Sequence, residues 1–145
     1  MATPGAFTVR LTANGQTTTQ PLVLAADPRA TRDGVTQTVL EAQLAHNLRV
    51  RDLVSDANRA AAMVQQAKRA SPDNPSVRAL EAEFITPPIR YSRPGLQAHI
   101  RYLYSMTLDA DQAVGRDAAE RYVELRKALD AFTARLRPLV PSSAR

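Results

Sequence analysis

The chain contains no cysteine and no tryptophan, and none of its apolar runs approaches the length of a membrane span. Without cysteine, its 145 residues form neither disulfides nor thiolate metal sites, although this absence does not decide the compartment. The opening residues, MATPGAF, lack the basic segment and following apolar segment of a secretory signal. We therefore expect neither a membrane span nor a signal peptide within this chain.

Acidic residues are in the minority, with 14 Asp and Glu against 19 Lys and Arg, and the net charge is +5. Excess positive charge is typical of nucleic-acid-binding proteins. Here the basic residues are mostly arginines spread from Arg10 to Arg145 and interleaved with acids, a composition that high-GC genomes also produce. We predict no nucleic-acid partner. The alternative, an independent basic nucleic-acid binder, would lose affinity steeply as salt is raised.

Alternating apolar and polar residues near the start of the chain predict a β-hairpin. Asn14-Gly15 is the dipeptide that a two-residue type I′ turn prefers, because both positions need a positive φ. Pro21 cannot donate a ladder hydrogen bond, which predicts an edge position for that part of the second strand. With this turn, one hairpin face carries five apolar side chains: Phe7, Val9, Leu11, Leu22 and Leu24.

After residue 30 the apolar residues recur at intervals of three and four, which is typical of helices. Helices are expected over 35–68, over 75–84 after the Asn74 cap, from Leu96 to Ala110, and around the stripe that ends at Leu136. The seam of the first of these is expected to consist of Leu40, Leu44, Asn47, Val50, Val54, Ala57, Ala61 and Val64.

These patterns predict a mainly α protein in which an N-terminal β-hairpin precedes an antiparallel three- or four-helix up-and-down bundle. Hydrophobic residues make up 44% of the chain and charged residues 23%, which is ordinary for a folded globular protein. We expect the hairpin over residues 1–29, the helical bundle over 30–140 and a flexible tail over 141–145.

No residue pattern indicates catalysis or a cofactor site. A GxSxG nucleophile motif is absent, and Glu81 and Glu83 fall on different faces of a short helix. His46 and His99 lack HxxxH or HExxH spacing, so we expect them to be polar residues at helix edges rather than ligands of one metal ion. No catalytic, cofactor-binding or metal-binding residue is therefore predicted.

The acidic residues between the last two helices allow two interpretations. Asp109, Asp111, Asp117 and Glu120 fall at positions 1, 3, 9 and 12 of an EF-hand-like loop. Gly115 comes one position too late for the sharp turn that a calcium loop makes. We therefore favour the interpretation in which two of these acids end one helix and the other two begin the next, where the helix dipole favours them.

Asn47 is a polar residue within the apolar seam of the long helix. It is expected either to be buried and fix the register of the helices, at some cost in stability, or to lie at the margin of the seam in contact with water.

Three of the four tyrosines fall within RYSRPGLQAHIRYLY, residues 90–104, together with several arginines. Tyrosine and arginine are enriched at protein contact surfaces. The favoured interpretation is that Tyr102 and Tyr104 pack with their hydroxyls at the rim. The alternative is a contact surface that consists of Tyr91, Arg93, Tyr102 and Tyr104.

The stretch GAFTVRLTANGQTTTQPLVLAADPR, residues 5–29, and the following NLRVRDLVSDANRA resemble the C-terminal region of bacterial exported sortilin-like proteins. These are Vps10-type, BNR-repeat β-propeller proteins, often labelled glycosyl hydrolases. In that family a small β-sandwich follows the propeller, and its last hairpin reads G-x-[FY]-T-V-R-L-T-x-N-G, then Q-P-L and D-P-R. SRPGLQAHIRYLY and DADQAVGRDAAERYVELRKAL look like its later helices, although the Val114-Gly115 turn departs from the family's proline and hydroxyl cap.

The resemblance implies that the hairpin forms the last strands of a sandwich, with the other strands and the propeller upstream in the same parent chain. It also implies a secreted protein, periplasmic or extracellular. The implied role is a non-catalytic C-terminal structural or association module of that β-propeller protein. The alternative is a part of a glycosidase-type hydrolase whose active site lies upstream.

The hairpin face needs a cover. Burying an apolar side chain of this size is worth roughly 1.5–3 kcal/mol, so five bare ones would forgo about 7–15 kcal/mol. That amount is comparable to the whole stability of a domain. Strands upstream in the parent chain would provide the cover, whereas in this chain the helices or a second copy would. We favour self-association, because the natural partners of a hairpin are strands.

Overall fold

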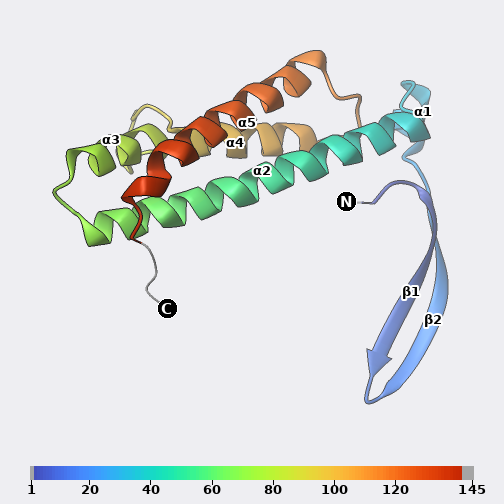
Figure 1. Ribbon diagram of the computed structural model, residues 1–145. Coiled ribbons are helices and arrows are strands. Elements are labelled where there is room, and N and C mark those ends of the chain that lie inside the picture. The colour runs from blue at the N-terminus through green and yellow to red at the C-terminus, as the bar shows by residue number, and fades with distance from the viewer. Residues whose placement is uncertain (1, 142–145) are drawn as a thin grey trace.

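A computed structural model describes residues 2–141 and confirms the mainly α fold with an N-terminal hairpin (Figure 1). The predicted tail over 141–145 lies outside the described residues beyond Pro141. None of the helices within residues 2–141 combines the length and apolarity that a membrane span requires. The elements are β1 (Gly5–Ala13), β2 (Gln16–Leu24), α1 (Pro28–Arg32), α2 (Gln37–Ala70), α3 (Pro75–Phe84), α4 (Leu96–Leu108), α5 (Arg116–Leu136) and the 3₁₀ helix η1 (Arg137–Leu139).

The hairpin has the register that its turn dipeptide predicts. Asn14 and Gly15 have φ values of 50° and 76°, as a type I′ turn requires. The antiparallel pairing places Phe7 opposite Leu22 and continues without interruption from the turn to Gly5. The two strands form a sheet with no third strand among the described residues.

The segment after the hairpin forms a helix, α1, that no pattern in the sequence predicted. Asp27 has an extended backbone, and its carboxylate accepts a hydrogen bond from the Arg29 backbone N–H at 2.8 Å. Asp27 is therefore the N-cap of α1, and Pro28 occupies the first turn, where its missing N–H is harmless. The conformation that a residue before proline prefers is also the conformation that a helix N-cap requires.

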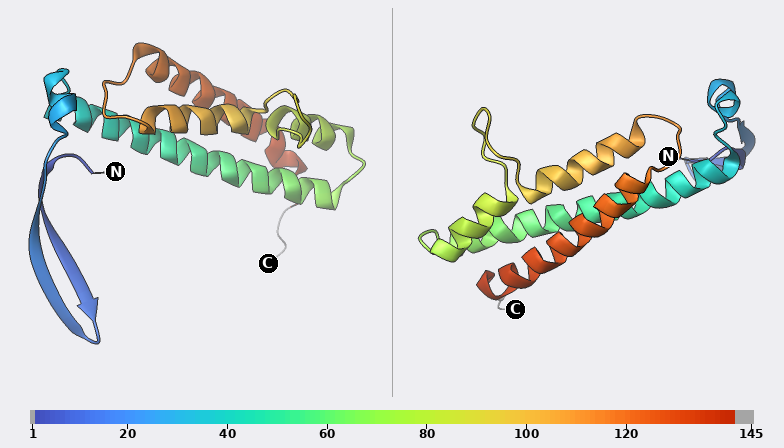
Figure 2. Two further views of the ribbon diagram at one scale, coloured as in Figure 1. Left: turned by 180° about the vertical axis from the view of Figure 1, so that it is seen from behind. Right: turned by 90° about the horizontal axis from the view of Figure 1, so that it is seen from above.

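The helices form a bundle around α2, which contacts α3, α4 and α5. The chain reverses after α2, so that α4 runs back along it, and α5 reverses again (Figure 2). Thr36 caps the N-terminus of α2 by accepting a hydrogen bond from the Val39 N–H at 3.3 Å. Asn74 caps α3 in the same manner, as predicted, through the Ser76 N–H at 2.9 Å.

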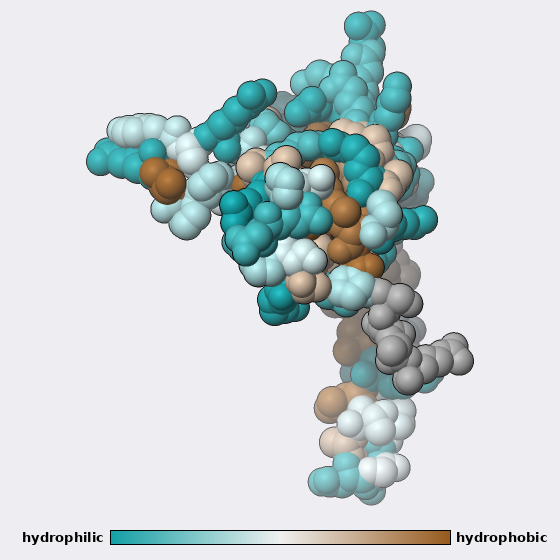
Figure 3. All heavy atoms as spheres, turned by 60° about the vertical axis from the view of Figure 1, so that its left-hand side comes forward, coloured by the Kyte–Doolittle hydropathy of each residue, from teal (hydrophilic) through white to brown (hydrophobic). Residues whose placement is uncertain are grey.

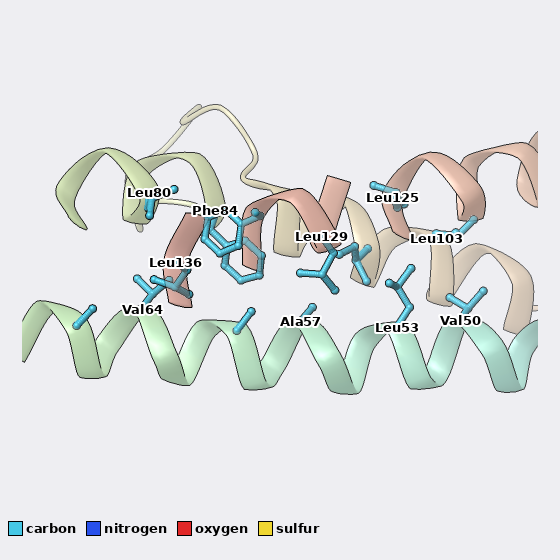
Figure 4. Packing of buried hydrophobic residues seen from close by; sticks show 14 of the residues in the cluster. Val50, Leu53, Ala57, Val64, Leu80, Phe84, Leu103, Leu125, Leu129 and Leu136 are labelled. Atoms are coloured by element: carbon cyan, nitrogen blue, oxygen red, sulfur yellow. The ribbon is translucent and has the colours of Figure 1, made fainter. Parts of the chain in front are cut away.

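The core lies between α2 and the three helices that cover it (Figure 4). The rings of Phe84 in α3 and Phe132 in α5 stack with their centroids 4.3 Å apart, and both side chains are fully buried. The largest buried cluster comprises Val50, Leu53, Ala57, Ala60, Val64, Ala67, Val77, Leu80, Phe84, Ile100, Leu103, Leu125, Leu129, Phe132 and Leu136.

The buried face of α2 differs in part from the predicted seam. Leu44, Val54 and Ala61, which were expected in it, are only half-buried. Leu53 and Ala60 are buried instead. A single stripe with steps of three and four describes one contact surface, whereas α2 is covered by three helices and buries a broader face.

Gly95 is the N-cap of α4 and lies against the backbone of α3. A Cβ at this position would come within 2.4 Å of the Phe84 carbonyl oxygen. The Gly95 N–H donates to the Thr86 hydroxyl at 3.0 Å, which holds this approach in place. The connection from α3 to α4 therefore depends on the absence of a side chain.

Substitution of Gly95 tests this close approach. We expect Gly95→Ala to lower the free energy of unfolding by about 1–3 kcal/mol, because backbone must move to admit the methyl group. Gly115→Ala is the matched control: Gly115 is also a helix N-cap, but a Cβ there meets only the Asp117 side chain, which can rotate away. Chemical denaturation measures both variants, and equal losses would contradict this account.

Candidate functional site

The hairpin presents an apolar face that the rest of the described chain leaves uncovered. All 18 positions of the two strands are exposed, and the hairpin projects away from the bundle (Figure 1). The exposed fractions of the five predicted face residues run from 38% for Leu24 to 66% for Leu11. Hydrophobic residues are visible on the surface of the hairpin in Figure 3. Of the two covers expected within this chain, the helices therefore do not provide one.

The two faces of the hairpin differ in polarity. Directly opposed residues share a face, so Phe7 and Leu22 lie together, whereas Thr8, Arg10 and their partners lie on the other side. Near the turn, the Thr12 and Thr17 hydroxyls are hydrogen-bonded at 2.9 Å. Arg10 is the only charged residue between Gly5 and Leu24. The hairpin is thus amphipathic with one dominant apolar face.

Pro21 interrupts the outer edge of β2 without interrupting the hairpin. At the turn, Ala13 and Gln16 form a backbone hydrogen-bonded pair. From there, hydrogen-bonded and non-hydrogen-bonded pairs of opposed residues alternate along the two strands. Thr8 and Pro21 therefore form a non-bonded pair, in which the backbone groups point outward. The missing N–H of Pro21 falls on the free edge of β2, as its predicted edge position requires.

The junction of the hairpin with the bundle is small. The Gln37 side-chain amide at the start of α2 donates to the Pro4 carbonyl at 3.1 Å. A small pocket of about 210 Å³ lies beside it, lined by residues of both hairpin ends and by Leu40, Gln43 and Asp111. The junction holds the base of the hairpin and leaves its length exposed.

The candidate tyrosine and arginine residues are distributed over a loop and a helix. Tyr91 and Arg93 lie exposed in the loop before α4, and Tyr91 has a positive φ of 63°. Tyr102 is 64% exposed on α4, whereas Tyr104 is half-buried against the core. Rim packing therefore describes Tyr104 and not Tyr102.

A layer of buried polar side chains caps the C-terminal end of α4. Gln43 donates to the carbonyls of Thr107 at 3.1 Å and Ala110 at 2.7 Å, and it accepts from the Gln112 N–H at 3.3 Å. Asn47, one turn later on α2, donates to the same Thr107 carbonyl at 3.0 Å. Asn47 is buried, which excludes the interpretation in which it lies in contact with water, while its role in fixing the helix register stays a prediction. These amides satisfy carbonyls that the end of a helix leaves unpaired.

His46 is buried, and its predicted position at a helix edge is wrong. Its side chain is 2% exposed and meets the Tyr122 ring edge-on at 6.1 Å between centroids. The Arg49 guanidinium lies over the same Tyr122 ring, 5.4 Å from its centroid. Burial lowers the pKa of His46 from its usual 6.5, and the charge of Arg49 lowers it further. His99, in contrast, is exposed as predicted.

Of the four acidic residues of the α4–α5 connection, Asp109 and Asp117 lie at the helix ends as predicted, whereas Asp111 lies between the helices. Asp109 is the C-cap of α4, and Asp117 is in the first turn of α5, while Glu120 lies one turn farther along that helix. Within residues 2–141, no group of three or more His, Asp or Glu side chains is placed to hold a metal ion.

Several charged side chains pair between helices of the bundle. Arg126 of α5 contacts Asp56 of α2 at 2.5 Å and also binds Asp130, beside a groove of about 500 Å³. Glu81 pairs with Lys68 at 2.8 Å, and Glu83 pairs with Arg135 at 2.5 Å. The two glutamates therefore bind different helices, α2 and α5, and do not converge on one site.

Comparisons with protein-family models, with curated proteins and with solved structures gave no match to this chain. The sortilin-like resemblance of residues 5–29 consequently stays a prediction.

The amide cap on α4 contributes to stability. We expect Gln43→Leu to lower the free energy of unfolding by about 1–3 kcal/mol, because the Ala110 carbonyl and the Gln112 N–H lose a partner in a partly buried setting. Gln65→Leu, at an exposed position of the same helix, is the control and should change the free energy of unfolding by less than about 0.5 kcal/mol. Urea denaturation of both variants gives the comparison, and similar effects would show that the cap is unimportant.

His46 makes stability depend on pH. Its folded-state pKa lies below the unfolded value of 6.5, so between the two values the unfolded chain binds more protons. Stability is therefore complete above about pH 6.5 and falls as the pH drops toward the folded pKa. We expect His46→Leu to reduce the loss of stability between pH 7.5 and 5.5, measured by urea denaturation.

His99→Gln is the matched control for this measurement, because His99 is exposed and should leave the pH dependence intact. A pH dependence that persists in full in His46→Leu would contradict the role of the buried imidazole.

Proposed function

We propose that this chain is a non-catalytic association module whose β-hairpin is completed by strands from outside the described residues. One observation carries the proposal: five apolar side chains share a hairpin face and stay 38–66% exposed, although the bundle has a core of its own. A two-stranded hairpin is marginally stable in water, whereas three or more strands with an apolar face are stable. The hairpin is therefore suited to joining a larger sheet.

The resemblance of residues 5–29 supports a finer form of the proposal. In that form the chain is the C-terminal module of an exported, sortilin-like β-propeller protein, and the missing strands belong to a sandwich upstream in the same parent chain. The separation of hairpin and bundle is consistent with this arrangement, since the face is available to strands from elsewhere. The helices then serve as a stable base for the hairpin.

The absence of convergent chemistry among the described residues argues against a hydrolase site within this module. Glycosidases use two carboxyl groups that flank one bond, about 5–9.5 Å apart. Here Glu81 and Glu83 are each held by a basic residue from a different helix, and Asp56 and Asp130 both bind Arg126. These carboxylates are engaged in ion pairs within or between helices.

Thiol labelling tests the proposal, because the chain has no cysteine of its own. Leu11→Cys is introduced both into this chain alone, in dilute solution, and into the longer protein obtained by extending the reading frame upstream of Met1. We expect the cysteine to react with a maleimide at least about tenfold more slowly in the longer protein, since burial under strands excludes the reagent. Glu124→Cys, exposed on α5, is the control and should react equally in both.

Two results would contradict the finer form of the proposal: equal labelling of Leu11→Cys in the two proteins, and an upstream frame that encodes no β-rich repeats. Turnover of aryl glycosides by this chain alone would contradict the non-catalytic role and favour the hydrolase alternative.

A further inference from the structure

We infer that the chain forms a symmetric homodimer in which β1 pairs antiparallel with β1 of a second copy, centred on Val9. This inference rests on the proposed role of the hairpin in association, and it names the edge and the occupant. The sheet would then have four strands in the order β2–β1–β1–β2.

The edge of β1 is the one equipped to bind a strand. Because Ala13 and Gln16 form a bonded pair, the residues with outward backbone groups alternate along each strand from that point. On β1 they are Ala6, Thr8, Arg10 and Thr12, each with an N–H and a carbonyl. On β2 they include Pro21, which has no N–H. An incoming strand therefore finds an uninterrupted row of donors only on β1.

The length and symmetry of β1 select the register. The strand spans nine residues, Gly5–Ala13, and Val9 is its middle residue. A two-fold axis at Val9 pairs every residue of β1 with a residue of the second β1. In this register Thr8 and Arg10 of the two copies exchange backbone hydrogen bonds, as their outward groups require. A shift to either side leaves the ends of both strands unpaired.

Side-chain chemistry favours the same register. Opposed residues share a face, so Val9 meets Val9 of the second copy and Phe7 meets Leu11. Apolar cross-strand pairs of this kind stabilise a sheet. Arg10, the only charged residue of the hairpin, lies opposite Thr8. Centring on Arg10 instead would place two arginines directly opposite each other, which is unfavourable.

The edge of β1 also lacks the usual protection against such pairing. Natural edge strands are commonly blunted by lysine, proline, bulges or a covering element. β1 contains no lysine or proline, its pairing with β2 has no bulge, and no described strand covers its outer edge. β2 carries one of these devices, Pro21. Because only β2 carries such a device, we expect a second copy to pair with the edge of β1 and not with the edge of β2.

Sedimentation velocity at several concentrations, with a pair of proline variants, tests the edge. Thr8→Pro removes an outward N–H from β1, and Thr19→Pro removes one from β2, while both spare the bonds inside the hairpin. We expect the unaltered chain to dimerise, Thr8→Pro to weaken the dimer at least about tenfold through its lost backbone bonds, and Thr19→Pro to leave it unchanged. Circular dichroism checks that the helices of both variants stay folded.

Disulfide trapping tests the register. Non-bonded antiparallel pairs have Cα atoms about 4.5 Å apart, within the range that a disulfide spans. Val9→Cys should therefore cross-link two copies readily under mild oxidation. Leu11→Cys is the matched control on the same face, because its two copies would be displaced by four residues, about 13 Å along the strands. We expect cross-linking of Leu11→Cys to be at least about tenfold slower, since that distance excludes a direct bond.

The inference is overturned if the chain is monomeric at every concentration, if Thr19→Pro weakens the dimer as much as Thr8→Pro, or if Leu11→Cys cross-links as fast as Val9→Cys. Each of these outcomes leaves the proposed function standing if Leu11→Cys is protected in the longer protein. Conversely, dimerisation through β1 together with unprotected Leu11→Cys in the longer protein would reject the proposed parent sandwich and retain the dimer.

Discussion

The packing of α2 against the other three long helices is the interaction on which the structure depends. α2 supplies six buried residues to the main core cluster, from Val50 to Ala67, and three of them are alanines. Small side chains allow the covering helices to approach closely, and Phe84 lies above them (Figure 4), stacked on Phe132. Since α3, α4 and α5 all rest on this surface, a change that bends α2 would disturb its contacts with all three helices at once.

Because the bundle completes its own core, the hairpin is structurally independent of it. The helices bury their apolar residues among themselves, whereas the apolar face of the hairpin receives no helix. The two parts meet at the Gln37 contact with Pro4 and through the short α1. Stability therefore resides in the helices, and the surface for association resides in the strands. Because of this division, one face of the hairpin can remain polar and in contact with water, while the other remains apolar and available to bind a partner.

The sequence predicted those features that local chemistry determines. Asn14-Gly15 set the hairpin register, and Asn74 and the apolar spacing located the helices to within a few residues. The buried polar layer was missed, because Gln43 and His46 are buried only where α4 and α5 happen to cross α2. The sequence did contain part of the signal for this layer: Gln43 and Asn47 are one turn apart on α2, and both reach the C-terminal end of α4. Side-chain type alone could not distinguish an amide that caps a neighbouring helix from one that faces water.

The position of Pro21 limits the size of any assembly that the hairpin enters. A hairpin with two competent edges can add a strand on each side, so that its copies polymerise into an open ribbon of the kind found in amyloid. With a proline on the outer edge of β2, one side of the sheet is closed to growth. Pairing through the remaining edge uses up that edge on both partners. The same residue that interrupts a row of hydrogen-bond donors thus acts as a terminator of polymerisation.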